Sequence, residues 1–273
     1  MIKNGSHFPA DSTTLERYFS PALRRSKALS PTTPLSGVQA VIHDRIWNAL
    51  LGGKLKPGMK LPEEQIGMIF KVSRTVVRKV LIVMEQEGIV SLLLNRGAYI
   101  VTPTPEKIYD VLEATQLVAC YIVEKLASKY KFLSEDDKAR LAEHNAAQRS
   151  AIEEQDFQAA RRLSLEFLLL LATVHQNKIF ASLQEQAMSH IVLAMLMNEG
   201  RTSERALLEI QLSILEFMAM GKKAEAGKAM NEYLDVIRES LNGVSPDRSG
   251  DLRSILSEGL DLSRISKRGR LSA

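Results

Sequence analysis

Apolar residues recur every three to four positions along most of this 273-residue chain, which is the spacing of amphipathic helices. In the first part of the chain this pattern predicts three short helices, over residues 36–51, 62–70 and 73–87. Two β-prone segments follow, at 89–94 and 98–101, with a turn of Asn95, Arg96 and Gly97 between them. This order of elements predicts a winged helix-turn-helix with a small β wing.

The helix predicted to begin at Ser73 has one apolar and one polar face. The Ser73 hydroxyl can cap the first free N–H groups of the helix. An apolar stripe follows at helical spacing, formed by Val77, Val80, Leu81 and Met84. Arg74, Thr75 and Arg78 point away from that stripe, where the second helix of such a motif meets a DNA major groove. One such arginine alone would suit a solvated surface, but the ordered set favours DNA binding.

Each of these side chains has a chemistry that suits DNA. The planar guanidinium group of arginine donates two parallel hydrogen bonds to a phosphate or to the O6/N7 edge of guanine. Thr75 can contact a phosphate or a thymine methyl group. Arg96, beside Gly97 at the wing turn, is placed to enter the minor groove or to contact a phosphate. An exposed turn arginine with no DNA contact explains Arg96 alone equally well.

The second half of the chain contains six helical segments and no convincing strand. They are predicted over residues 105–131, 134–154, 156–176, 178–198, 202–220 and 222–242. The third segment is apolar on nearly all sides between residues 163 and 174, which is typical of a central helix covered by several neighbours. Amphipathic helices joined by short turns predict an all-α six-helix bundle.

Composition divides the chain into four parts. Residues 35–103 form the predicted winged helix-turn-helix domain, and residues 104–242 form the helical domain. Residues 1–34 are rich in Ser, Thr and Pro and residues 243–273 in Ser, Gly and Arg, so we expect a flexible N-terminal arm and a mobile tail. Within the tail, four apolar residues have the spacing of one short docking helix: Leu252, Ile255, Leu256 and Leu260.

Charge is distributed unevenly between the two domains. Residues 35–103 contain 9 basic residues (Lys or Arg) and 5 acidic residues (Asp or Glu), a net charge of +4. Residues 104–243 contain 16 basic and 21 acidic residues, a net charge of −5. A basic module next to an acidic one suits a DNA-binding domain joined to a domain with another role. The single cysteine, Cys120, is expected to be a buried thiol. Without a signal sequence or an apolar run of membrane-spanning length, we expect a cytoplasmic protein with no membrane partner.

The ordered motif around the first helices resembles the GntR family of bacterial transcriptional regulators. Its residues are Ile46, Leu55, Pro57, Gly58, Leu61, Glu63, Ile66, Val72, Ser73, Arg74, Thr75, Val77, Arg78, Leu81, Glu85, Gly88, Ile89, Val90 and Gly97. The six-helix segment resembles the FadR-like (FCD) effector domain. The resemblance implies a homodimeric regulator, usually a repressor, that binds a palindromic operator in double-stranded DNA and releases it when a metabolite binds. The expected DNA-binding residues are Ser73, Arg74, Thr75, Arg78, Arg96 and Gly97.

The helical domain departs from many of the proteins that it resembles. These hold a divalent metal with one Asp and three His, and the matching positions here are Ser164, Leu168, Gln211 and Tyr233, which are poor metal ligands or none. Thr115 stands where an arginine often meets the carboxylate of the effector. We therefore expect no metal and no other cofactor, and a pocket at these five positions that suits a neutral or hydrophobic small-molecule effector. Alternatively, side chains fill the cavity and the domain only dimerises.

Other functional classes are less favoured. His144, His175 and His190 have no partner at metal-ligand spacing, which favours capping or surface positions. A sequence-tolerant architectural DNA binder is the second hypothesis, and it would show steep salt dependence and little operator preference. An enzyme is the third. The sequence offers no nucleophile–base pair, metal set or Gly-rich phosphate loop to support it, so we expect no catalytic residues.

Overall fold

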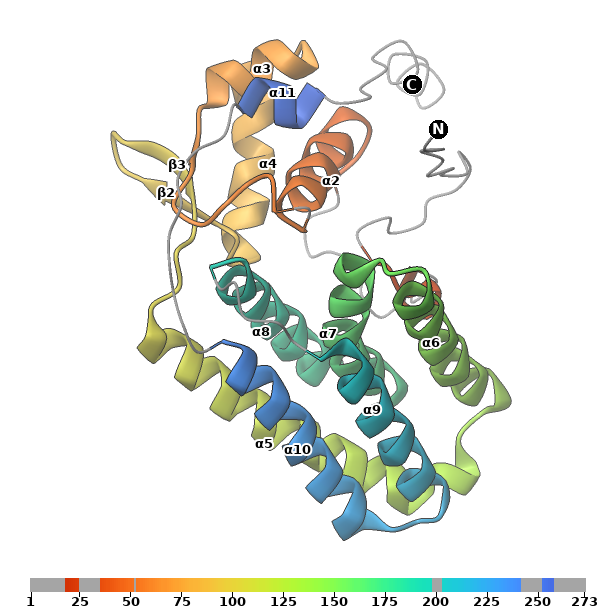
Figure 1. The fold of residues 1–273 in the computed structure, drawn as a ribbon. Helices are drawn as coiled ribbons and strands as arrows, with labels where there is room; N and C mark the ends of the chain where they lie inside the picture. The colour runs from red at the N-terminus through yellow and green to blue at the C-terminus, as the bar shows by residue number, and fades with distance from the viewer. Residues whose placement is uncertain (1–17, 25–34, 52, 198–202, 242–251, 258–273) are drawn as a thin grey trace.

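The computed structural model describes residues 18–24, 35–51, 53–197, 203–241 and 252–257. Figure 1 shows two parts, an upper one that contains a small sheet and a lower one built from long helices. The fold is the predicted one, a winged helix-turn-helix followed by an all-helical domain. A single cluster of buried apolar side chains extends through both parts.

The winged-helix domain combines three helices with a three-stranded antiparallel sheet. Its elements are α2 (Val38–Leu51), β1 (Lys60–Leu61), α3 (Glu63–Phe70), α4 (Arg74–Gln86), β2 (Val90–Leu93) and β3 (Gly97–Ile100). The sheet order is β1-β3-β2, and Lys60 lies opposite Tyr99. Sequence analysis missed β1 because two residues are too few to show an alternating pattern. Trp47 is buried in the core of this domain.

The turn between α3 and α4 has specific backbone requirements. Lys71 ends α3 in the left-handed region, with φ of 54°. A Cβ on Gly67 would lie 2.9 Å from the Val72 carbonyl oxygen, so the close approach of the turn requires glycine there. The Ser73 hydroxyl oxygen then accepts a hydrogen bond from the Val76 N–H at 3.4 Å, which confirms the predicted helix cap. The turn thus fixes where the second helix of the motif begins.

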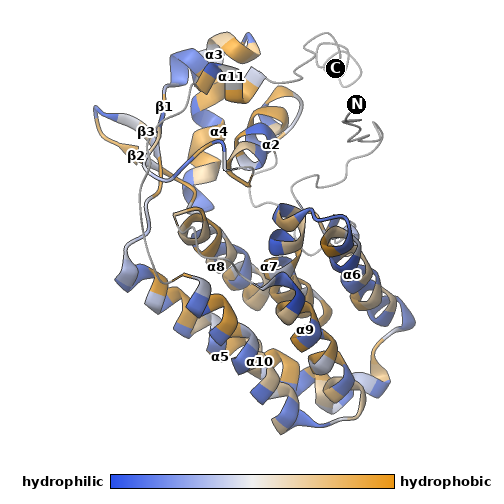
Figure 2. Ribbon diagram, in the orientation of Figure 1, coloured by the Kyte–Doolittle hydropathy of each residue, from blue (hydrophilic) through white to orange (hydrophobic). Residues whose placement is uncertain are grey.

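The helical domain contains the six predicted helices, each within a few residues of its predicted bounds. They are α5 (Pro105–Lys129), α6 (Glu135–Glu153), α7 (Phe157–Val174), α8 (Lys178–Leu196), α9 (Glu204–Ala219) and α10 (Lys223–Ser240), with a short 3-10 turn, η2 (Tyr130–Phe132), after the first. Helix α7 packs against α5, α6, α8 and α9 and is buried along almost its whole length. Figure 2 shows apolar residues concentrated where these helices face one another. Cys120 is only partly buried, on α5, where its thiol donates to the Asn231 side-chain oxygen at 3.3 Å.

A segment of the predicted flexible arm is packed against the helical domain. Helix α1 (Pro21–Arg24) lies against α6 and α7, and Tyr18, Ser20 and Leu23 are fully or almost fully buried. The expectation of a flexible arm is therefore wrong for residues 18–24. Its composition gave no sign of this, because the partners of these few side chains lie more than 100 residues away.

A short helix of the predicted tail also packs against the rest of the chain. Helix α11 (Leu252–Ser257) lies against α3 and α2 at the top of Figure 1, and Leu252 and Leu256 are buried. The predicted docking helix is thus found, and the expectation of a mobile tail is wrong for these residues. Leu260 lies outside the described residues. Among the helices that the structure describes, none is long and apolar enough to cross a membrane.

A buried histidine joins α2 to the end of α4. The two ring nitrogens of His43 lie 3.2 Å from the Asp44 carboxylate and 2.8 Å from the Glu87 carboxylate, which also accepts from the Trp47 ring N–H at 3.2 Å. Burial lowers the pKa of His43, but the hydrogen bonds to Asp44 and Glu87 outweigh burial and raise it to about 9. His43 is therefore a buried cation at neutral pH, paired with two carboxylates.

The raised pKa of His43 predicts a loss of stability in alkali. Its contribution is complete below the unfolded value of 6.5 and disappears as the pH rises through about 9. We expect the free energy of unfolding to fall by about 2–3 kcal/mol between pH 7 and pH 10. Urea unfolding at a series of pH values measures this. A His43→Gln variant should show a flatter profile over this window, and an equally steep fall in that variant would assign the effect to other groups.

Candidate functional site

The polar face of α4 is exposed in the way that DNA binding requires. The side chains of Arg74 and Arg78 are 71% and 59% exposed, and Ser73 and Thr75 are also exposed. The opposite face is held in the core by the predicted apolar stripe of Val77, Val80, Leu81 and Met84, all buried. Four of the six predicted DNA-binding residues, Ser73, Arg74, Thr75 and Arg78, thus lie together at the start of one helix, on its outer side.

A glutamate that the sequence analysis did not assign to the site holds both arginines. Glu63, in the first turn of α3, accepts a hydrogen bond from Arg78 Nη1 at 2.8 Å, and its second carboxylate oxygen lies 3.8 Å from Arg74 Nε. The Glu63 side chain is 10% exposed, so the pairs are shielded on one side. This arrangement restricts the arginine side chains before any ligand is present. No local pattern could have identified Glu63, because its partners lie on another helix.

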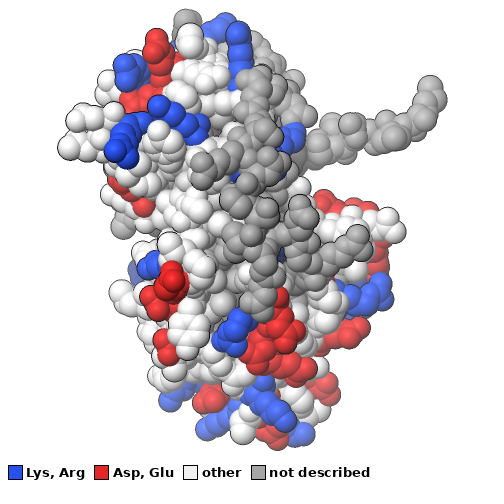
Figure 3. Space-filling view, turned by 60° about the vertical axis from the view of Figure 1, so that its left-hand side comes forward, with Lys and Arg blue, Asp and Glu red and all other residues white. Residues whose placement is uncertain are grey.

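The wing carries a second basic residue, Lys60, in addition to the predicted Arg96. Arg96 is exposed at the turn between β2 and β3, where Asn95 and Gly97 have positive φ values of 60° and 93°. The Lys60 Nζ atom lies 5.8 Å from the centre of the Tyr99 ring, and the Lys60 side chain runs past Gly97. Lys60 is exposed, so β1 adds a cation to the wing that was missed with β1 itself. Figure 3 shows Lys and Arg side chains at several places on this face of the winged-helix domain, whereas Asp and Glu are frequent on the helical domain.

The predicted effector positions lie in the interior of the helical domain, and Tyr233 is hydrogen-bonded to two of the others, Ser164 and Gln211. The Tyr233 hydroxyl donates to the Ser164 carbonyl at 2.5 Å and lies 3.3 Å from Gln211 Oε1. Leu168 is buried in the same bundle, and Thr115 is buried with its hydroxyl donating to the Val111 carbonyl at 2.7 Å. Burial raises the pKa of the Tyr233 hydroxyl well above its ordinary value, so it stays a neutral donor.

Two side chains of α6 add polar atoms to the interior. Gln148 Nε2 donates to the Ser164 hydroxyl at 2.9 Å, and His144 Nδ1 lies 2.9 Å from the Ser20 hydroxyl. Gln148 Oε1 and His144 Nε2 are buried and have no hydrogen-bond partner among the described residues. Of these two residues, Gln148 is hydrogen-bonded directly to a predicted effector position, Ser164.

The expected histidine positions need correction. His144 is fully buried rather than capping or superficial, it stacks on Phe167 at 5.9 Å between ring centres, and burial lowers its pKa to about 3. His175 occupies the C-cap position of α7, as expected. His190, on α8, is partly buried and faces Gly88 of the winged-helix domain. Within the described part of the chain, no three His, Cys, Asp or Glu side chains are grouped as metal ligands.

Each of the two domains matches the model of a known protein family. The family model for bacterial regulatory proteins of the gntR family matches residues 39–100, and the model for the FCD domain matches residues 110–236. The two matches cover the helix-turn-helix with its wing and almost all of the bundle.

The chain belongs to the GntR family of bacterial regulatory proteins.

Curated relatives of this GntR protein are transcriptional regulators. The transcriptional regulator LutR of Bacillus subtilis is 28% identical over 70% of this chain and 95% of its own length. The transcriptional repressor RspR of Escherichia coli is 22% identical over 81% of this chain and 95% of its own. The solved structure of E. coli McbR/YncC shares the fold, with a TM-score of 0.63 at 17% identity over 76% of this chain and 98% of that one. The protein is thus a GntR-family transcriptional regulator with a DNA-binding helix-turn-helix.

A buried ion pair of α7 contacts the winged-helix domain of this GntR regulator. Arg162 Nε donates to Glu166 Oε1 at 2.8 Å, and both side chains are almost completely buried. The Arg162 guanidinium carbon lies 5.0 Å from the centre of the Trp47 ring in the winged-helix domain. The same arginine therefore contacts groups in both domains. The sequence did not predict this position for Arg162.

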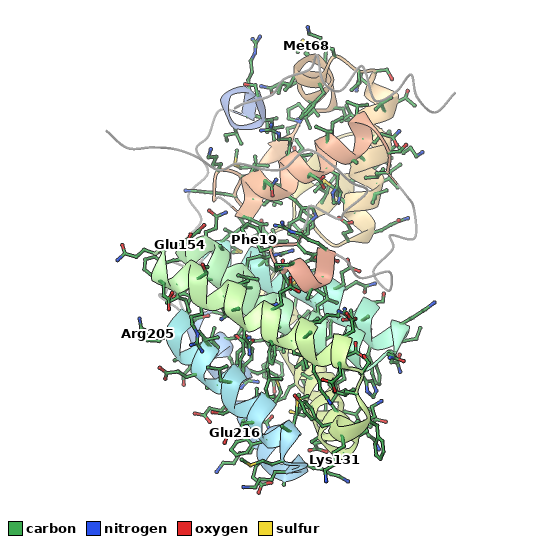
Figure 4. The ribbon with its side chains drawn as sticks, turned by 90° about the vertical axis from the view of Figure 1, so that its right-hand side faces the viewer. Phe19, Met68, Lys131, Glu154, Arg205 and Glu216 are labelled. Atoms are coloured by element: carbon green, nitrogen blue, oxygen red, sulfur yellow. The ribbon has the colours of Figure 1, made fainter. Side chains whose placement is uncertain are left out.

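The N-terminal segment completes this connection. The backbone N–H groups of Phe19 and Ser20 donate to the Glu166 carboxylate at 3.0 and 2.7 Å, and Figure 4 shows Phe19 where the two domains meet. Tyr18 adds a hydrogen bond to Glu185 at 2.5 Å. Burial raises the pKa of Glu166, and the Arg162 charge and the two backbone donors oppose that shift. Because three donors converge on it, we treat Glu166 as the counter-ion of Arg162.

Proposed function

We propose that this regulator binds a palindromic operator as a homodimer and acts as a metabolite-responsive repressor. The observation that carries the proposal is the pair of exposed arginines, Arg74 and Arg78, held side by side by Glu63 on the outer face of α4. Side chains restricted in this way lose less entropy on contact with base edges than free ones do. We further assign residues 35–103 to DNA binding and residues 104–242 to dimerisation and effector binding.

Selection from random duplexes tests sequence-specific binding. The purified protein should enrich an inverted repeat whose half-sites are spaced by about one helical turn of DNA. Enrichment of no site by the folded protein would contradict the proposal. Binding that weakens steeply with salt but shows little operator preference would instead support an architectural DNA binder.

The dimer surface that we propose is an apolar face formed by α5 and α8. On α5, Tyr109, Leu117 and Tyr121 are 64%, 71% and 46% exposed, and on α8 Ile179 and Leu183 are 69% and 47% exposed. The two helices pack against each other, and the Tyr121 ring lies edge-on to Phe180 of α8. Large apolar side chains gathered on two adjacent helices favour burial against a second copy.

A charge placed on this face should separate the protomers. We expect Leu117→Glu to convert a dimer into a monomer at micromolar concentration, because a carboxylate buried without a partner opposes association. Light scattering after size-exclusion chromatography measures the change. Met220→Glu, at a residue 56% exposed after α9, is the matched control and should remain dimeric. A dimeric Leu117→Glu variant would place the interface elsewhere.

The effector that we propose is a small neutral molecule bound beside the buried polar cluster. Ser164, Gln211 and Tyr233 offer uncharged polar atoms, and Gln148 Oε1 and His144 Nε2 lack partners among the described residues. A neutral ligand with a hydrogen-bond donor would satisfy Gln148 without adding a buried charge. A thermal-shift screen of neutral metabolites and of divalent metals tests this. No shift with any of them would favour a filled core that serves only for dimerisation.

The hydroxyl of Tyr233 should stabilise the fold whether or not an effector binds. We expect Tyr233→Phe to lower the free energy of unfolding by about 1–3 kcal/mol, because the buried Ser164 carbonyl loses its donor. Chemical denaturation measures this loss. Tyr130→Phe, at a partly buried tyrosine of η2 outside the proposed dimer surface, is the control and should change the stability little. Equal stability of the two variants would show that the Tyr233 hydrogen bonds contribute nothing.

A further inference from the structure

A cavity of about 300 Å³ lies between the two domains. The winged-helix domain contributes Leu51, at the end of α2, and Gly53, and the helical domain contributes residues of α7 and α8. The volume falls at the lower end of the range of small-molecule sites. Ser164, Gln211 and Tyr233 are not among its described lining residues, so it is distinct from the polar cluster inside the bundle.

Apolar side chains form much of the cavity wall. Leu165 of α7 and Val192 and Met195 of α8 line it from the helical domain, and all three are buried. Leu196 lines it as well and is only partly buried. A surface of this kind favours an apolar ligand body over a sugar or another strongly hydrated molecule.

The charged part of the wall is made of two consecutive arginines of α7, Arg161 and Arg162. Each already has one carboxylate partner: Arg161 Nε lies 3.3 Å from Glu204, and Arg162 Nε lies 2.8 Å from Glu166. Arg162 is only 3% exposed, and its Nη1 atom is buried without a hydrogen-bond partner among the described residues. An unsatisfied N–H on a buried cation is costly, and an acceptor oxygen supplied by a ligand would remove that cost.

We propose that this interdomain cavity binds an organic monocarboxylate with a compact apolar body. Its carboxylate accepts hydrogen bonds from Arg162 and Arg161, and its body packs on Leu165, Val192 and Met195. An uncharged apolar molecule would leave Arg162 Nη1 unsatisfied. A second carboxylate would add another buried negative charge beside two arginines that are each already paired with a glutamate, at a further cost of desolvation.

A ligand in this position would act on the relative placement of the two domains. It touches Leu51 and Gly53 in the winged-helix domain and α7 and α8 in the helical domain at the same time. Such a ligand favours whichever domain arrangement keeps both walls in contact with it, and so shifts the population toward that arrangement. The site therefore offers a route from a carboxylate metabolite to the DNA-binding domain that does not pass through the polar cluster of the bundle.

Isothermal titration of the full-length protein without DNA tests the binding directly. The probes are para-tert-butylbenzoate, its neutral amide para-tert-butylbenzamide, and acetate. We expect the benzoate to bind and both the amide and acetate to bind at least about tenfold more weakly, since one lacks the charge and the other the apolar body. No binding of the benzoate, or equal binding of the amide, would overturn the proposal.

Two substitutions locate the bound benzoate. Leu196→Trp adds bulk at the partly buried edge of the cavity and should reduce affinity by about tenfold or more, and Arg161→Gln should reduce it several-fold. Leu212→Trp, at a residue of α9 outside the cavity, is the matched control and should bind as the parent does. Circular dichroism checks that each variant is folded. Unchanged affinity in folded Leu196→Trp or Arg161→Gln would overturn the assignment, whatever the outcome of the DNA-binding experiments.

Discussion

Replacement of Glu166 with Gln should lower the free energy of unfolding by about 3–5 kcal/mol, the usual cost of breaking a buried ion pair on one side. Glutamine keeps the shape of the side chain but leaves the Arg162 cation almost completely buried without its counter-ion. The amide also accepts more weakly than a carboxylate from the Phe19 and Ser20 N–H groups. Chemical and thermal denaturation measure the loss, which corresponds to a decrease in Tm of roughly 10 °C or more for a chain of this size.

Two further variants identify the cause of this loss. Glu209→Gln, at an exposed glutamate of α9, makes the same chemical change and should leave stability within about 0.5 kcal/mol of the parent. The double variant Arg162→Gln/Glu166→Gln removes both charges and should be more stable than Glu166→Gln alone. Parent-like stability of Glu166→Gln would mean that Glu166 is protonated in the folded protein.

The Glu166→Gln variant also tests how the N-terminal segment is attached to the helical domain. Glu166 is the acceptor for two backbone N–H groups of that segment, and its partner Arg162 contacts Trp47 in the winged-helix domain. The network therefore joins three parts of the chain that are distant in sequence. We infer that a change at Glu166 alters the packing of the domains against each other as well as the stability of the bundle.

Local pattern was sufficient to predict the helices of the two domains and the exposed polar face of α4. The apolar stripe of α4 and the Ser73 cap depend on residues at most a few positions apart, so their spacing is visible in the sequence. The nearly all-apolar α7 likewise indicated its own central place in the bundle. These features are local consequences of helix geometry.

The features that sequence analysis missed depend on partners far away along the chain. His144 is buried by its contacts with Ser20 and Phe167, and nothing in the mostly polar sequence of α6 indicates them. Glu63 is positioned by the turn that brings α3 and α4 together, and Arg162 is opposite Trp47 only because the two domains pack against each other. Such contacts are set by tertiary structure, which periodicity does not encode.

Substitution of the two arginines on α4 should have the largest effect on operator binding. We expect Arg74→Ala and Arg78→Ala each to reduce operator affinity by about 1–3 kcal/mol and the double variant to bind only weakly and without sequence preference. Glu63 holds both guanidinium groups, so loss of either also changes the restraint on the other. Fluorescence anisotropy with the selected operator and with single-base variants measures these effects.

The pattern of losses across DNA sequences distinguishes the role of each arginine. If Arg78 contacts a guanine, Arg78→Ala should relax the preference at that one base pair, whereas a phosphate contact gives a uniform loss and a shallower dependence on salt. Arg149→Ala, at an exposed arginine of α6, is the matched control for the loss of one positive charge and should leave binding almost unchanged. Unchanged operator affinity in the folded double variant would rule out this face of α4 as the DNA-contacting surface. Glu63 would then be a purely structural partner of two surface arginines.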